Sequence, residues 1–140
     1  MKRWQTALRR DVLLFLGGGL GYCLMELSWR SYTHWSMGVT GGACLVGMAA
    51  IHRALRQHPV AVQALAGAGL ITAAEFCVGC VVNLWLGWNV WDYSDWRFDL
   101  LGQICPVFCA LWVLLALAVM TAFSLADRRQ PTDRSGTQTA

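Results

Sequence analysis

The chain has 140 residues, of which 56% are hydrophobic and only 14% are charged, and its mean hydropathy is +0.45. This composition excludes a soluble domain of this size, because a soluble surface needs more polar side chains. The formal net charge of +3 calls for no nucleic-acid partner, since the basic residues that orient a membrane protein account for it. The contacts expected of such a chain are with membrane lipids.

Four apolar stretches predict four transmembrane helices, at about residues 12–29, 37–55, 60–88 and 100–126. The sequence therefore predicts an all-α membrane protein, a four-helix transmembrane bundle within residues 1–126. The second stretch is the weakest, because its strictly apolar part, Gly38 to Ile51, is short and needs snorkelling arginines to extend it. Residues 127–140 are polar and have nothing to bury, so a disordered cytoplasmic tail is expected there.

The basic residues fall almost entirely on one side of this four-helix arrangement, and only Arg30 and Arg97 fall on the other. The majority side holds Lys2, Arg3, Arg9, Arg10, Arg53, Arg56, Arg128, Arg129 and Arg134. The positive-inside rule then predicts that both termini are cytoplasmic. The first helix is expected to be retained, because no small-x-small cleavage site follows its apolar run.

Glycines spaced four residues apart predict close packing between helices, at Gly17 with Gly21 and at Gly38 with Gly42. Tryptophans gather around the two predicted outer loops, which is typical of an aromatic belt at the membrane interface. An aromatic binding site is the alternative interpretation of the same residues.

The chain also carries a hint of internal duplication. The first and third stretches each hold one glutamate, and the second and fourth each begin with Gly-x-x-Cys, at 41–44 and 102–105. These two matches suggest a 2+2 internal repeat inside the bundle.

Glu26 and Glu75 are candidate functional residues, because an ionisable group inside a transmembrane helix usually faces a partner or a wet cavity. Counting about 1.5 Å per residue places both glutamates roughly 20 Å from the cytoplasmic edge. Cys44 and Cys105 fall nearer the outer surface, so the four side chains could line one outward-facing polar vestibule. Glu26 has a structural alternative, an interfacial pair with Arg30, whereas no basic residue lies within a helical turn of Glu75.

The six cysteines do not have the spacing of a metal site, since the histidines fall in or near loops away from Cys77 and Cys80. A redox Cys-x-x-Cys needs an exposed position at a helix start, so packing is the preferred interpretation of this pair. The sequence contains no phosphate loop and no hydrolase motif. We therefore expect neither an enzyme nor a bound cofactor.

The most specific segment runs from Val90 to Trp112, VWDYSDWRFDLLGQICPVFCALW. It is an acidic, aromatic outer loop followed by a helix, and Pro106 is expected to kink that helix. Either Asp92 or Asp99 is expected to cap the helix or to pair with Arg97, the basic residue in the same loop.

Part of this segment is a recognisable motif, with Trp-Asp-Tyr-Ser at 91–94, then Phe98, then Gly-Gln-Ile-Cys at 102–105. With Glu26 and Glu75 ahead of it, the motif resembles that of the small bacterial membrane proteins labelled type IV ABC-transporter permeases. The resemblance implies a four- or five-helix protein of the bacterial inner membrane and a link to transport.

The leading hypothesis is a transport-related or ligand-binding, permease-like protein that works as a homo-oligomer or with partner membrane subunits, because one copy is too small to enclose a transport path. Its pathway candidates are Glu75, Glu26, Gln103, Asp92, Tyr93 and Cys105. The alternative is a structural or regulatory membrane protein without a substrate, in which these residues brace the helices. A membrane thiol oxidoreductase acting through Cys77 and Cys80 is the third hypothesis.

Overall fold

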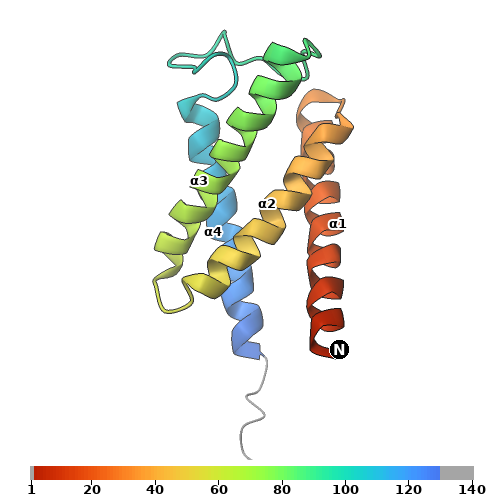
Figure 1. Ribbon diagram of the computed structural model, residues 1–140. Helices are drawn as coiled ribbons and strands as arrows, with labels where there is room; N and C mark the ends of the chain where they lie inside the picture. Colours follow the sequence, from red (N-terminus) through yellow and green to blue (C-terminus); the bar gives the residue numbers. More distant parts are fainter. Residues whose placement is uncertain (1, 130–140) are drawn as a thin grey trace, which may run out of the picture.

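The computed structural model describes residues 2–129 and is all-helical (Figure 1). In chain order its helices are α1 (Lys2–Arg30), α2 (Trp35–Ala54), α3 (Val60–Gly79), the π-helical continuation η1 (Cys80–Trp85) and α4 (Pro106–Arg129). Within the described residues there is no strand, only an isolated bridge between Leu100 and Ile104. The predicted all-α four-helix arrangement is confirmed.

The helices run alternately up and down, so the connections separate into two ends (Figure 1). The N-terminus, the α2–α3 connection and the last turn of α4 lie at one end, which we call the terminal end. The α1–α2 connection and the long loop of residues 86–105 lie at the opposite end, which we call the loop end. Within residues 2–129, the backbone of α1 lies close to that of α2 alone among the helices, and no Cα atom of α1 lies within 8 Å of one in α4.

Within residues 2–129, three helices are long and apolar enough to cross a membrane, namely α1, α3 with η1, and α4. The chain is therefore an integral membrane protein with three or four apolar helices. The remaining helix, α2, lies between α1 on one side and α3 and α4 on the other, and it buries Met37, Gly41 and Met48. Because α2 is covered by protein on both sides, it needs fewer lipid-facing apolar side chains than its neighbours.

The close packing of α1 on α2 uses the predicted glycines of α2 but a different glycine face of α1. On α2, a Cβ atom built on Gly42 would lie 2.6 Å from the carbonyl oxygen of Phe15. A Cβ atom built on Gly18 would lie 2.6 Å from the carbonyl oxygen of Gly41, and one on Gly19 would lie 2.7 Å from that of Gly38. Gly17 and Gly21, the predicted pair, have nothing within 4 Å. Since each residue turns a helix by about 100°, a register one residue along selects another face.

The predicted ends of the first, third and fourth helices are wrong. The first helix begins at Lys2, because its charged first turns stay helical outside the apolar run. The third ends at Trp85, just before Gly87, which has a φ of +66°. The fourth begins at Pro106 rather than at about 100, because Leu101 and Gly102 before it also have positive φ.

Pro106 was expected to kink the fourth helix. It does not, because it is the first residue of α4. A proline is well suited to this place, because the first N–H groups of a helix have no partner within the helix. The predicted tail also begins too early, since Asp127 to Arg129 continue α4. The remainder of that predicted tail lies outside the described residues.

Candidate functional site

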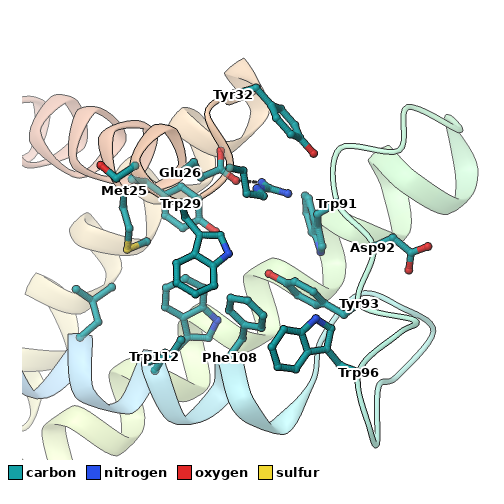
Figure 2. Close-up of a pocket in the computed structure, with 15 residues that line it drawn as sticks. Met25, Glu26, Trp29, Tyr32, Trp91, Asp92, Tyr93, Trp96, Phe108 and Trp112 are labelled. Atoms are coloured by element: carbon teal, nitrogen blue, oxygen red, sulfur yellow. Dashed lines mark hydrogen bonds and ion pairs between the residues drawn. The ribbon is translucent and has the colours of Figure 1, made fainter.

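A cavity of about 530 Å³ opens at the loop end between α1, the loop and the start of α4 (Figure 2). Aromatic side chains make up most of its lining. Tyr93, Trp96, Phe108 and Trp112 lie along one side in Figure 2, and Glu26 and Tyr32 lie on the other. The cavity therefore combines an aromatic wall from the loop and α4 with a more polar wall from α1.

The rings of the aromatic wall contact one another in a continuous row. Tyr93 stacks on Phe108 with ring centroids 4.4 Å apart, and Trp96 meets the same ring edge-on at 5.7 Å. The ring centroids of Phe108 and Trp112 are 6.5 Å apart, and those of Trp112 and Tyr22, which is on α1, are 6.0 Å apart. Tyr22 and Trp112 thus bridge α1 and α4 where their backbones stay apart.

Glu75 lies behind this bridge rather than in the lining. Its carboxylate accepts a hydrogen bond of 2.6 Å from Nε1 of Trp112 and one of 3.3 Å from the Tyr22 hydroxyl. The residue is 2% exposed, and within residues 2–129 no ion pair reaches it. An indole N–H can only donate, so the Glu75 oxygen that faces it must be an acceptor.

Glu26 is held by its neighbours on α1 and in the following connection. It accepts hydrogen bonds from Arg30, as an i, i+4 ion pair, and from the Thr33 hydroxyl at 2.6 Å. Arg30 also donates to the carbonyl oxygen of Val90 at 3.1 Å and lies over the ring of Tyr32. Glu26 therefore lines the cavity as half of a neutralised pair that ties α1 to the loop.

Gln103 is the centre of a hydrogen-bond network that holds the loop against η1. Its side-chain oxygen accepts from Asn83 at 2.7 Å, and its backbone carbonyl accepts from Nε1 of Trp91 at 3.0 Å. The Asn83 side-chain oxygen in turn accepts from the backbone N–H of Val90 at 2.7 Å. Gly79 makes room for this network, since a Cβ atom there would collide with Gln103 and with the ring of Trp91.

Asp92 and Asp99 close turns inside the loop, so the expectation that one of them caps the fourth helix or pairs with Arg97 is wrong. Asp92 accepts from the backbone N–H of Ser94 at 2.9 Å, and Asp99 accepts from that of Gly102 at 2.7 Å. The hydrogen bonds from the Ser94 hydroxyl and N–H hold the pKa of Asp92 below its ordinary value. Asp92 is therefore an ionised group at the rim, and its carboxylate points away from the aromatic wall (Figure 2).

Tyr93 follows Asp92 and turns its ring inward, where it stacks in the wall. Burial, and next the nearby Glu75 carboxylate, raise the pKa of the Tyr93 hydroxyl above its ordinary value. The hydroxyl consequently stays a neutral hydrogen-bond donor at physiological pH.

The sequence model of the family described as "Putative ABC-transporter type IV" matches residues 12–129. The chain belongs to this family. Neither the curated proteins nor the solved structures include a significant match.

The resemblance expected from the Trp-Asp-Tyr-Ser and Gly-Gln-Ile-Cys motifs is confirmed, and the structure gives those motifs of the type IV ABC-transporter family a physical meaning in this chain. The N–H of Tyr93 donates to the carbonyl of Gly102 at 2.8 Å, and the Trp91 indole donates to Gln103. The two halves of the motif therefore bind each other and close the loop over the end of the bundle.

The predicted site residues divide into three groups. Glu26, Asp92 and Tyr93 line the cavity. Glu75 adjoins it through Tyr22 and Trp112. Gln103 and Cys105 are 2% and 1% exposed and lie in the core of the loop, away from the lining.

The expected vestibule of two glutamates and two cysteines is therefore not the arrangement observed. Of the four, only Glu26 lines the cavity at the loop end, while Cys44 lines a smaller one deeper in the bundle. Sequence reasoning missed Tyr22 and Trp112, which connect Glu75 with the cavity. The only sequence signal for these two residues was that each is an aromatic residue in a predicted helix, at about the same membrane depth as a glutamate.

The structure also bears on the Cys77–Cys80 pair, on metal binding and on the 2+2 repeat. Cys77 is exposed and Cys80 is half-buried, so packing between helices does not account for Cys77. Within the described part of the chain, no three His, Cys, Asp or Glu side chains are grouped to hold a metal ion. Gly41 to Cys44 lies within α2, whereas Gly102 to Cys105 lies in the loop, and the 2+2 repeat stays a prediction.

Proposed function

We propose that this protein is a small transport-related membrane protein that binds a ligand in the cavity at the loop end, with Glu75 as the residue that responds to binding. The observation that carries the proposal is the pair of hydrogen bonds to Glu75. Both donors, Tyr22 and Trp112, line the cavity. A ligand that moves either ring therefore changes the surroundings of a buried carboxylate.

The cavity is proposed to face outward from the cytoplasm. Two basic residues, Arg30 and Arg97, lie at the loop end. Supporting the proposed orientation, the other basic residues within residues 4–129 lie at the terminal end, namely Arg9, Arg10, Arg53, Arg56, Arg128 and Arg129. The positive-inside rule then makes the terminal end cytoplasmic. A ligand would reach the cavity from outside or sideways from the outer leaflet.

A partner is also proposed, either further copies of this chain or other membrane subunits. The splayed α1 and α4 leave the bundle open on one side, so one copy does not enclose a path across the membrane. The sequence has no phosphate loop to bind a nucleotide, and an ATP-driven function would need that site from another subunit.

The structural alternative is favoured by the Gln103 network, which braces the loop without any ligand. It does not account for the open aromatic cavity or for a buried carboxylate that touches its wall. Bracing is consequently the role we assign to Gln103 and Cys105, and binding the role we assign to the cavity.

Native mass spectrometry of gently purified protein tests the proposal. Ser28 lines the cavity, so Ser28→Trp should fill it and remove any co-purifying small molecule. Leu24→Trp is the matched control, because Leu24 is exposed one turn away on the same helix and outside the lining. The proposal is wrong if wild type and both variants retain the same molecules in the same amounts.

A further inference from the structure

We infer that the ligand of the cavity is an amphiphilic organic cation, with a quaternary ammonium head among the aromatic rings and an apolar tail in the groove between α1 and α4. The inference rests on the proposed function and deepens it by naming the class of ligand. Three features carry it: the wall of rings, the balance of charge around them, and the shape of the space below.

The aromatic wall suits a cation that cannot form hydrogen bonds. A quaternary ammonium is attracted to the faces of Trp, Tyr and Phe rings, and the attraction is strongest where water is excluded. The row from Trp96 through Phe108 and Trp112 to Tyr22 offers several such rings within one cavity.

Glu75 increases the attraction of the Trp112 and Tyr22 rings for a cation. A carboxylate that accepts from an indole N–H and from a phenol O–H polarises both donors and leaves the rings richer in electrons. Trp112 and Tyr22 are held in this way. Within residues 2–129 no ion pair reaches Glu75, so the positive charge of a bound cation would stabilise the ionised form of this carboxylate.

The same balance of charge disfavours an anionic head. Among the described residues, Arg30 is the one basic side chain in the lining, and its guanidinium already donates to Glu26 and to the carbonyl of Val90. Asp92 at the rim, ionised at physiological pH, adds negative charge at the mouth. An anion entering the cavity would meet no unpaired basic group.

The space below the aromatic wall suits an alkyl chain. A second cavity of about 240 Å³ shares Tyr22, Met25 and Leu115 with the first and continues down the groove to Gly21 and Val119. No Cβ atom fills the groove at Gly21, where an added one would meet nothing within 4 Å. The two cavities together follow α4 from residue 108 to 119, roughly 16 Å at about 1.5 Å per residue.

Binding of alkylammonium probes to the purified full chain in lipid nanodiscs tests the inference. Decyltrimethylammonium should bind about tenfold more tightly than its neutral amine-oxide analogue or decyl sulfate, because the cation is attracted to rings that the Glu75 carboxylate polarises. Glu75→Gln should remove most of this preference for the cation while leaving the neutral probe unchanged. Equal binding of cation, neutral probe and anion would overturn the inference.

The tail is tested by a matched pair of glycines. Gly21→Leu fills the groove and should weaken the binding of decyltrimethylammonium severalfold without affecting the binding of tetramethylammonium. Gly69→Leu is the control, because Gly69 on α3 also has nothing within 4 Å but lies outside the groove. An equal effect of the two variants on the long-chain probe would contradict the placement of the tail.

The lipid composition of the nanodiscs identifies the source of the cation. If decyltrimethylammonium fails to bind only in phosphatidylcholine nanodiscs, the choline headgroups of the bilayer compete for the site and are its ligand. If it binds in both phosphatidylcholine and phosphatidylglycerol nanodiscs, the ligand is a free amphiphile.

The Ser28→Trp variant separates the cation inference from the proposed function. If it blocks a neutral or anionic probe better than the cation, the cavity binds ligands but the cation inference fails; if it blocks none, the proposed function fails too.

Discussion

Trp112 on α4 donates its indole N–H to Glu75 on α3 across 2.6 Å, while its ring lines the cavity at the loop end. One side chain therefore touches both the space open to a ligand and a carboxylate that is 2% exposed. Tyr22 repeats the arrangement from α1. Glu75 is thus coupled to the cavity without lying in it.

Replacing Glu75 separates its charge from its hydrogen bonds. In Glu75→Gln the amide oxygen can accept from Trp112 and the amide N–H can donate to Tyr22, so thermal stability should stay close to that of wild type. Glu75→Ala leaves the Trp112 N–H without an acceptor and should cost about 1–3 kcal/mol. Unfolding followed in detergent measures both. Full ligand binding by the stable Gln variant would show that the charge has no role.

Gly102 is expected to be the least replaceable glycine of the loop. Its φ is +68°, and an added Cβ atom would lie 2.5 Å from an Asp92 carboxylate oxygen and 2.7 Å from the Ser94 hydroxyl. Gly87 has a φ of +66° with nothing within 4 Å, so Gly87→Ala carries the strain of about 1–2 kcal/mol without the collision. Gly102→Ala should lower the melting temperature more than Gly87→Ala and change tryptophan fluorescence, and equal effects would contradict the loop packing.

The register of α1 on α2 is tested by neighbouring glycines. Gly18→Ala would place a Cβ atom 2.6 Å from the Gly41 carbonyl oxygen and should destabilise the bundle by about 1–3 kcal/mol. Gly17→Ala meets nothing within 4 Å and should be neutral or stabilising, since alanine favours a helix. Thermal unfolding of the two variants measures the difference. The opposite order would restore the predicted Gly17 face as the packing face.

Topology reporters test the orientation and whether α2 crosses the membrane. A reporter active only in the cytoplasm should be active after Ala140 and inactive after Trp96. Fusions after Tyr32 and after His58 flank α2 and should report opposite sides. If the fusions after Tyr32 and His58 report the same side, α2 does not cross and the chain has three crossings. If the fusions after Ala140 and Trp96 report the same side, the predicted orientation is contradicted.

The sequence predicted the helices well, because a transmembrane helix leaves a long apolar run that needs no tertiary information. It did not predict the loop, since positive φ at Phe98 and Leu101 has no signature in those residue types. The bridge from Tyr22 to Trp112 was equally hidden, because it depends on how two helices far apart in the chain face each other. Glu75 could be singled out as an ionisable residue inside an apolar stretch, but its hydrogen-bond partners could not be predicted.

The central claim is that a ligand occupies the cavity beside Tyr22 and Trp112. It is tested most directly by photo-crosslinking in intact cells, with p-benzoylphenylalanine in place of Trp96, which lines the cavity. Trp85, 80% exposed and outside the lining, is the matched control position. The account predicts a defined small-molecule adduct at position 96 that Ser28→Trp abolishes and that is absent at position 85. The same bulk-lipid adducts at both positions, unchanged by Ser28→Trp, would contradict it.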